Sequence, residues 1–364
     1  NNKKKKKEKE KSSNNCEGSV EVAVKVLEKN SKQGEKEFKA EIVSIGRMRH
    51  KNLVQLLGWS YDHWKGQPVL VYEYMPNQSL DRWLNVIGRG GRPQQPTESL
   101  MESSTESSGR NILGWAERYH VLKGVASGIV YLHEEWEMVV VHRDLKPGNI
   151  MLDAEFNAKL GDFGLARLIK NRDRIFHHPG GNGISGGDGI LGNGILGEST
   201  QTFTIAGTPG YMAPECLESG SITKESDVYS FGAVAMEVAT GRKLSSENLN
   251  WLWNLYQENR LIEAAGVDLM GTEGFDEKQL ELVLKLSLAC CQTQPSSRPS
   301  MRQILHALSS SSSSPSSSSD PRNSVSFIDS NFPISRPYSS LSVSPLSLSS
   351  LSITLPSTSN PSIS

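Results

Sequence analysis

Hydrophobic and polar positions alternate along residues 16–27 (CEGSVEVAVKVL), the pattern of a β-strand. Four valines share one face of this predicted strand, and Lys25 and Leu27 share the other. Residues 69–75 (VLVYEYM) predict a second, buried strand. Residues 139–152 (VVVHRDLKPGNIML) predict an apolar strand, a polar loop and another apolar strand.

A helical period replaces this alternation in residues 35–48 (EKEFKAEIVSIGRM). Glu41 lies within the apolar stripe of this predicted helix, so we expect its carboxylate to be buried beside a cation. Residues 226–241 (SDVYSFGAVAMEVATG) are apolar nearly all round, which predicts a central buried helix. The stripe of the first helix consists of Phe38, Ile42 and Ile45.

Four segments show neither pattern, and we expect them to lie outside the folded core. Serine makes up 26 of the last 56 residues, which predicts a disordered tail with many possible phosphorylation sites. The folded part is therefore expected to run from about Gly18 to Leu308. The four segments are a lysine-rich start (1–17), a polar insertion (88–111), a glycine-rich insertion (180–197) and the serine-rich tail (309–364).

Charge is unevenly distributed along the 364 residues. Residues 3–11 hold seven lysines and two glutamates, whereas the whole chain has a net charge of −1, so the remainder is acidic. This balance argues against a nucleic-acid-binding fold. The lysine run is interpreted as a solvated segment, with weak contact to anionic lipid as the alternative.

Cysteine content and hydropathy limit the environment of the chain. The four cysteines have no metal-site spacing, which favours a reducing compartment. No apolar run approaches the length of about 18 residues that a membrane span needs. The chain begins at Asn1 without a signal-peptide pattern, and we interpret it as a fragment of a longer protein.

The motif G-x-G-x-x-G occurs three times within residues 180–197, where nine of eighteen residues are glycine. A nucleotide-binding glycine loop needs a preceding strand and a following helix or strand that aim backbone N–H groups at phosphate. Neither surrounds this segment, so it is interpreted as low-complexity sequence. The chain also lacks a G-x-x-x-x-G-K-[ST] motif, which argues against a P-loop enzyme.

Three polar residues near buried apolar runs indicate phosphate chemistry. Asp144 and Asn149 lie in the loop of residues 139–152, and Asp162 follows closely in KLGDFGLAR. Buried carboxylates cost solvation energy unless a cation or a hydrogen bond compensates it. One carboxylate suits a substrate hydroxyl, and a carboxylate with an amide oxygen suits Mg²⁺.

These motifs resemble those of the eukaryotic protein kinases, with HRDLKPGN, DFG and APE in the family's order. The resemblance implies an α+β, two-lobed kinase fold, with a small mixed β-sheet lobe that carries one regulatory helix and a larger, mainly α-helical lobe. The small lobe is expected at 18–75, up to and including the hinge, and the large lobe at 76–308. ATP and Mg²⁺ are the implied cofactors.

The resemblance also implies roles for individual residues. Asp144 would be the catalytic base, Lys146 would neutralise charge on the transferred group, and Asn149 and Asp162 would hold Mg²⁺. Lys25, in VAVK, would bind the α- and β-phosphates and pair with Glu41, which is preferred to Glu37 because it lies mid-stripe. A solvated strand lysine is the alternative for Lys25.

Further residues match positions that are structural or regulatory in the family. Tyr72 is at the gatekeeper position, and Glu73 to Met75 would offer backbone groups to adenine. Asp227 would brace the catalytic loop. The remaining matches are the Phe163 and Gly164 of DFG and the charges Glu215 and Arg298, which would form a buried salt bridge, although in the sequence alone each could be a surface charge.

The segment between DFG and APE corresponds to the activation segment of the family. Its residues indicate serine/threonine specificity and control by phosphorylation. Lys146 together with GTPGYMAPE, which contains Thr208, resembles serine/threonine kinases rather than tyrosine kinases. Arg143 precedes the catalytic aspartate and would pair with a phosphate on this segment. The candidate acceptors are Ser199, Thr200, Thr202 and Thr204.

Longer stretches resemble plant receptor-like kinases, most closely those with an L-type lectin ectodomain. Examples are LVYEYMPNQSLDRWL and ESDVYSFGAVAMEVATGRK. The implied partners are ATP, protein substrates with serine or threonine, and other receptor kinases. The implied location is the cytoplasmic side of the plasma membrane within a receptor, and the cytoplasm for this chain alone.

One departure from the family leaves two functional hypotheses. The family places a G-x-G-x-x-G-x-V loop and two strands before VAVK, but here only Gly18 to Val20 resemble the end of that loop, so the first strands are expected to be missing. The first hypothesis is an ATP-dependent serine/threonine kinase. The second is a kinase-fold binding module with impaired turnover. The catalytic carboxylates favour the first.

Overall fold

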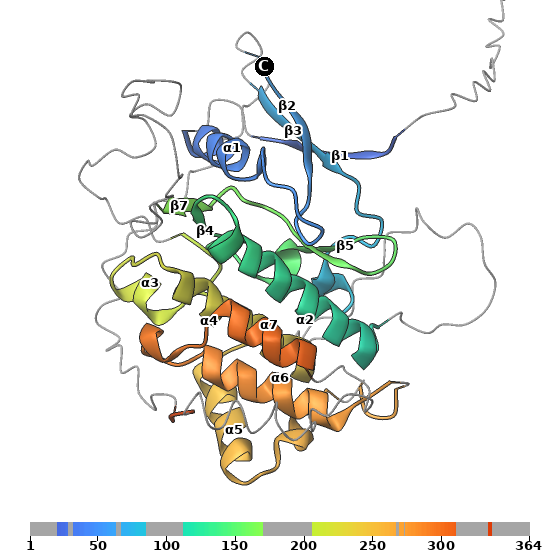
Figure 1. Ribbon diagram of the computed structural model, residues 1–364, viewed down its shortest axis with the longest axis vertical. Helices are drawn as coiled ribbons and strands as arrows, with labels where there is room; N and C mark the ends of the chain where they lie inside the picture. Colours follow the sequence, from blue (N-terminus) through green and yellow to red (C-terminus); the bar gives the residue numbers. More distant parts are fainter. Residues whose placement is uncertain are drawn as a thin grey trace, which may run out of the picture.

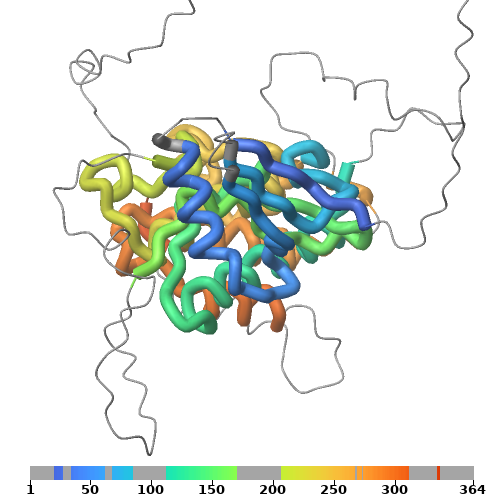
Figure 2. Tube along the Cα trace, turned by 90° about the horizontal axis from the view of Figure 1, so that it is seen from above, coloured from blue at the N-terminus to red at the C-terminus, as the bar shows by residue number. Residues whose placement is uncertain are grey.

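The computed structural model describes residues 20–27, 32–62, 67–84, 112–169, 206–266, 269–272, 274–310 and 334–336. These residues form a small part with a β-sheet and one helix above a larger helical part (Figure 1). Seen from above, the N-terminal elements lie over the rest of the molecule (Figure 2). The predicted α+β, two-lobed fold is confirmed.

The small lobe contains a three-stranded antiparallel sheet in the order β1-β3-β2. Leu70 of β3 is completely buried and lies opposite Lys25 on one side and Trp59 on the other. Directly opposed residues point to the same face of a sheet, so Lys25 shares the face of Leu70. The strands are β1 (Val22–Val26), β2 (Leu56–Asp62) and β3 (Gln67–Glu73).

Helix α1 (Lys32–Ile45) packs through the predicted stripe. Phe38 and Ile45 are buried, and the ring of Phe38 meets Trp59 edge-on at 6.0 Å between centroids. The valines of β1, in contrast, are the exposed face: 42% of Val22 and 56% of Val24 are accessible. The alternation therefore predicted the strand but not which of its faces the described residues would cover.

The large lobe is built around helix α4 (Lys224–Thr240), which is buried along almost its whole length, as predicted. Helix α6 packs on α4, and helix α7 packs on α2 (Figure 1). The other helices are α2 (Trp115–Val130), α3 (Pro214–Glu218), α5 (Ser246–Gln257), α6 (Glu277–Cys290) and α7 (Met301–Ser310). A π-helical turn continues α2 (Tyr131–Glu135), and short 3-10 turns occur at Leu80–Arg82, Pro147–Asn149, Leu261–Ala264 and Pro295–Ser297.

Four short strands lie where the two lobes meet. The predicted strand, loop and strand of residues 139–152 are confirmed as β4, a polar loop and β5. Backbone hydrogen bonds join the lobes: Val54 N–H donates to Leu160 O (2.8 Å), and Leu160 N–H donates to Asn52 O (2.9 Å). The strands are β4 (Val139–Val141), β5 (Ile150–Leu152), β6 (Ala158–Leu160) and β7 (Arg167–Ile169), paired as β4-β7 and β5-β6.

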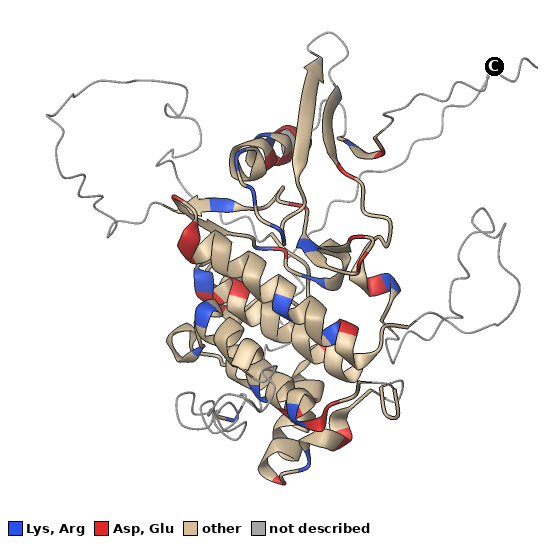
Figure 3. Ribbon diagram, turned by 45° about the vertical axis from the view of Figure 1, so that its right-hand side comes forward, with Lys and Arg blue, Asp and Glu red and all other residues tan. Residues whose placement is uncertain are grey.

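Basic and acidic residues are interspersed along the helices (Figure 3). Among the residues that the structure describes, no helix is both long and apolar enough to cross a bilayer. The lysine-rich start and the insertions predicted at 88–111 and 180–197 lie outside the described residues. The predicted domain boundaries stay predictions.

Candidate active site

The loop between β4 and β5 positions Asp144, which is only 7% exposed. Lys146 Nζ donates a hydrogen bond to one carboxylate oxygen (2.7 Å), and Thr208 Oγ1 donates to the other (2.6 Å). Burial alone would raise the pKa of Asp144, but the bonds from Lys146 and Thr208 outweigh it, and the pKa lies below its ordinary value. Asp144 is therefore held ionised.

Asn149, at the other end of this loop, forms hydrogen bonds with the same residue. Its side-chain N–H groups donate to the backbone oxygen of Asp144 (2.8 Å) and to its carboxylate (2.9 Å). Lys146 also donates to Thr208 Oγ1 (2.8 Å). The structure thus brings together four predicted site residues: Asp144, Lys146, Asn149 and Thr208.

Asp227, at the start of α4, braces the loop from below. Its carboxylate accepts the backbone N–H groups of His142 (2.7 Å) and Arg143 (2.9 Å). His133 Nε2 lies 3.0 Å from it. Burial would raise the pKa of Asp227, but His133 and these donors hold it below its ordinary value. Arg143 has a φ of 72°, a left-handed conformation that the two backbone bonds help to fix.

Lys25, Glu41 and Asp162 form a second cluster, between the lobes. Lys25 Nζ lies 3.1 Å from Glu41 and 2.6 Å from Asp162, and Glu41 is 1% exposed. Burial lowers the pKa of Lys25, but the two carboxylates outweigh it, and the pKa is raised. The predicted pairing of Lys25 with Glu41 is confirmed, and the solvated alternative is not supported.

The hydroxyl of Tyr72 also donates a hydrogen bond to Glu41. The register explains this contact, because Tyr72 lies opposite Ala23 and so shares the sheet face of Lys25. Burial and the adjacent Glu41 raise the pKa of Tyr72, so its hydroxyl stays a donor. The sequence predicted the position of Tyr72 but not this bond.

Glu73 makes contacts that the sequence did not predict. One carboxylate oxygen accepts the backbone N–H of Gln55 (2.7 Å), and the other accepts Lys159 Nζ (2.7 Å). The backbone N–H of Glu73 donates to Gln55 O (3.1 Å). The side chain thus ties β3 to β6. The binding of adenine by backbone groups of Glu73 to Met75 stays a prediction; Met75 itself is buried.

Phe163 and Gly164 follow Asp162 and position it. Phe163 is fully buried, and its ring packs on His142 with 4.8 Å between centroids. His142 Nε2 lies 3.0 Å from Gly161 O, so the segment is fastened to the loop between β4 and β5. A Cβ on Gly164 would meet the side chain of Glu37 at 3.4 Å, which shows how closely α1 approaches.

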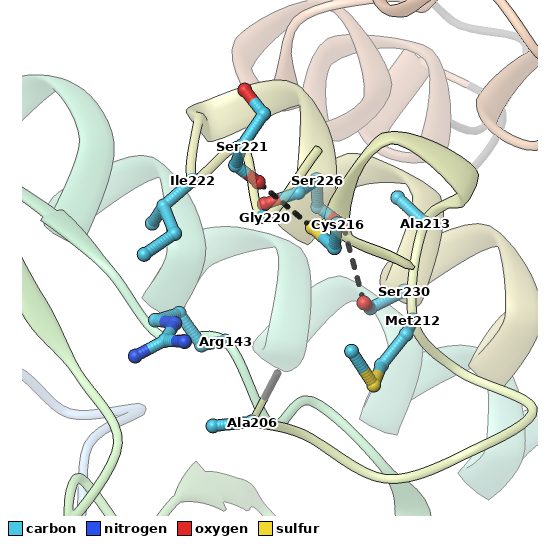
Figure 4. Close-up of a pocket in the computed structure, with 10 residues that line it drawn as sticks. All are labelled: Arg143, Ala206, Met212, Ala213, Cys216, Gly220, Ser221, Ile222, Ser226 and Ser230. Carbon is cyan, nitrogen blue, oxygen red and sulfur yellow. Dashed lines mark hydrogen bonds between the residues drawn. The ribbon is translucent and has the colours of Figure 1, made fainter. Parts of the chain in front are cut away.

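Arg143 borders a small cavity beside the activation segment. Its guanidinium donates to Leu165 O (3.3 Å). Burial and the nearby Arg167 lower the pKa of Arg143. Cys216 lies across the cavity and donates through Sγ to Ser221 O at 3.0 Å (Figure 4). The candidate phosphate acceptors Ser199, Thr200, Thr202 and Thr204 lie outside the described residues.

Glu215 and Arg298 form the predicted salt bridge, away from the two clusters. The guanidinium donates to both carboxylate oxygens (2.6 and 2.8 Å), and its side chain is 0% exposed. The alternative of two surface charges is therefore wrong for this pair.

Asn149 and Asp162 are the candidate ligands for a divalent metal. Within the described residues, no group of three His, Cys, Asp or Glu side chains could hold a metal ion. One amide oxygen and one carboxylate suit Mg²⁺, which keeps several waters and takes its remaining ligands from phosphates. The donor set therefore fits an ion that arrives with a nucleotide.

Comparison with known proteins identifies the family. Residues 11–308 match the protein kinase domain. The chain is 42% identical over 298 residues to L-type lectin-domain containing receptor kinase IV.2 of Arabidopsis thaliana, covering 79% of this chain and 37% of the relative. It is 39% identical over 297 residues to L-type lectin-domain containing receptor kinase SIT2 of Oryza sativa subsp. japonica, again 79% and 37%.

A third relative, the probable L-type lectin-domain containing receptor kinase S.5 of Arabidopsis thaliana, is 38% identical over 307 residues, which are 81% of this chain and 40% of the relative. The chain thus spans well under half the length of these relatives. It belongs to the protein kinase family, whose members use ATP and a divalent metal to phosphorylate proteins. Within the family it matches plant receptor-like kinase domains.

Proposed function

We propose that the chain is the kinase domain of a plant receptor-like protein and transfers the γ-phosphoryl group of ATP to serine and threonine hydroxyls. The observation that carries this proposal is the arrangement around Asp144, where Lys146 and Thr208 each donate to one carboxylate oxygen. Phosphoryl transfer depends mainly on positioning and on charge stabilisation, and this arrangement supplies both.

Asp144 would orient the acceptor hydroxyl and accept its proton as the bond to phosphorus forms. Its lowered pKa keeps the carboxylate ready to accept at neutral pH. Lys146, which contacts the same carboxylate, would offset negative charge on the transferred group. Thr208 links both residues to the activation segment, so the fold of that segment controls the geometry of the base.

Lys25 would bind the α- and β-phosphates. Glu41 holds its ammonium group in place, and Tyr72 holds Glu41, so the cation is positioned before nucleotide binds. Asn149 and Asp162 would hold Mg²⁺, which neutralises phosphate charge when bound. Backbone groups of Glu73 to Met75 would receive adenine.

Location and partners are proposed from the relatives. They are receptor kinases, so we propose that this domain lies on the cytoplasmic side of a plasma membrane and meets other receptor kinases there. The alternative of a binding module without turnover rests on the departure from the family's glycine loop alone, whereas the presence of Lys25, Asp144, Asn149 and Asp162 supports the kinase.

Calorimetric titration with Mg-ATP tests the nucleotide half of the proposal. The chain is expected to bind with a Kd between about 1 μM and 1 mM, the usual range for enzyme substrates. Lys25→Met should weaken binding at least tenfold, and Lys39→Met, which removes an exposed lysine of α1, should not. An absence of binding by the unaltered, folded chain would overturn the proposal.

A further inference from the structure

Three residues far beyond the last helix lie against the large lobe. Helix α7 ends at Ser310, yet Ile334–Arg336 contact the lobe beside α5 and the end of α6 (Figure 1). Ile334 packs against the hydrophobic core, and the Arg336 guanidinium lies over the ring of Trp253, 5.2 Å from its centroid. The sequence predicts disorder here, so this contact calls for an explanation.

The side-chain amide of Gln292 forms hydrogen bonds with the backbone of this segment and not with its side chains. Ser335 N–H donates to Gln292 Oε1 (3.3 Å), and Gln292 Nε2 donates to Ser335 O (3.4 Å). Gln292 is 7% exposed, and its Nε2 also donates to Leu288 O (2.9 Å), which fixes the amide plane. This reciprocal pair has the pattern by which a strand binds another extended chain.

Two residues of α5, one of which is Trp253, each carry a buried polar atom. The indole N–H of Trp253 and the side-chain oxygen of Asn250 are buried, and neither has a hydrogen-bond partner in the described structure. The two residues are three positions apart and so lie on one face of the helix. With Ile334–Arg336 in place these two atoms still have no partner in the described structure, so the segment is held through the indole face of Trp253 and through Gln292.

We propose that Trp253 and Gln292 form a docking surface for an extended peptide with an apolar residue two positions before an arginine. Its occupant is the chain's own segment Ile334–Arg336. Arginine suits the indole face through a cation–π contact. In the sequence, prolines flank the segment (PISRP), and the residue before a proline is restricted to extended conformations. The segment is thus preorganised to bind a surface that forms hydrogen bonds with its backbone.

The tether makes this docking feasible with modest affinity. The 23 residues from 311 to 333 can reach roughly 80 Å when extended, so distance does not limit the contact. Because the segment and the surface belong to one chain, the effective concentration of the segment is on the order of a millimolar. A three-residue contact that is weak between separate molecules is therefore still populated within one chain.

A labelled peptide of residues 332–338 (FPISRPY) tests recognition by the surface. The full chain with Ile334→Ser and Arg336→Ala should bind this probe at least tenfold more tightly than the unaltered chain, whose surface is occupied. Ser335→Ala should behave like the unaltered chain, because the surface contacts only the backbone of Ser335. Adding Trp253→Leu to the double variant should abolish binding, whereas adding Trp59→Leu, in the small lobe, should not.

Hydrogen–deuterium exchange on the full chains tests occupancy directly. Backbone amides of α5 and residues 288–293 should exchange faster in the Ile334→Ser, Arg336→Ala variant than in the unaltered chain. Equal exchange would overturn the proposal, as would equal probe affinity for both chains or probe binding that survives Trp253→Leu. Protection that rises with protein concentration would mean that a second copy of the chain supplies the segment. That result would overturn the proposal that each chain binds its own segment.

Discussion

Arg298 is a fully buried cation whose partners satisfy its charge. It donates to both carboxylate oxygens of Glu215 and to the backbone oxygens of Gln292 and Glu225, and it lies over the ring of Tyr229. Removing one partner of such a pair leaves an uncompensated charge in the interior. The pair therefore fixes α3 and the activation segment to the helical core.

Glu215→Ala should lower the free energy of unfolding by about 3 kcal/mol, because Arg298 then stays buried without a counter-charge. For a domain of this size the melting temperature should fall by roughly 6–12 °C. Glu263→Ala is the matched control, since its exposed pair with Arg260 should add nothing measurable. Calorimetry measures both, and equal melting temperatures would contradict this account of the pair.

The sequence predicted the site residues that are marked by a local spacing or by a contiguous motif. Glu41 was identified because its stripe is local, and Asp144 and Asp162 because their motifs are contiguous. Glu73 with Lys159, 86 positions apart, was missed, since no local spacing records which distant side chains meet. The bond from Tyr72 to Glu41 was missed for the same reason: it depends on how α1 lies against the sheet.

Helices α4 and α6 approach closely at Gly232. A Cβ at this position would lie 2.6 Å from Cys290 Cβ and 2.9 Å from Cys291 Sγ, both inside normal contact distance. The glycine therefore determines how near the two central helices can pack. Sequence periodicity predicted that α4 is buried all round but could not show which residue faces α6.

Gly232→Ala should destabilise the chain by about 1–3 kcal/mol, because the added methyl forces the helices apart by more than helix propensity recovers. Gly58→Ala is the control, since nothing lies within 4 Å of its Cβ position. Urea unfolding compares the two variants. A Gly232→Ala chain as stable as the Gly58→Ala chain would contradict the close packing of α4 on α6.

Strand β1 shows how much the alternation of hydrophobic and polar residues can predict about a single strand. Alternation predicted the strand and placed Lys25 on the face opposite the valines, which the register shows to be the face of Leu70. It could not decide that the valine face would be the exposed one, because burial depends on what packs against a face. The segment Ile334–Arg336 lies within sequence that composition alone predicts to be disordered, and a three-residue contact leaves no compositional signal.

The stability of the whole chain at acid pH depends on carboxylates whose pKa values are lower in the folded chain than in the unfolded chain. Asp144 and Asp227 both titrate below their ordinary value in the folded chain. The unfolded chain therefore takes up these protons more readily than the folded chain, and acid favours unfolding. Their contribution to stability is present above about pH 4 and is lost as the pH falls through the folded pKa values.

Urea unfolding between pH 7 and pH 3 should show a free energy of unfolding that declines most steeply below about pH 4. Asp227→Asn should be less stable at pH 7, because the charge beside His133 is lost, but should decline less on acidification. Circular dichroism follows both curves. Parallel decline of the variant and the unaltered chain would show that Asp227 does not contribute to the acid transition.

The two-lobed architecture was predictable because motif order and hydrophobic period agree along most of the chain. The join between the lobes was not, since it rests on backbone bonds such as Val54 to Leu160 and on the ion pair of Glu73 with Lys159. These contacts set how the Lys25 cluster faces the Asp144 cluster. We propose that the two clusters act together as one phosphoryl-transfer site.

Transfer of labelled γ-phosphate from Mg-ATP to a generic basic protein, measured for the unaltered chain and for Asp144→Asn, decides whether such a site operates. We expect incorporation on serine and threonine that falls at least about a hundredfold in the variant, the usual contribution of a positioned base, while Mg-ATP binding is retained. No incorporation by the unaltered chain, or equal incorporation by both, would contradict it.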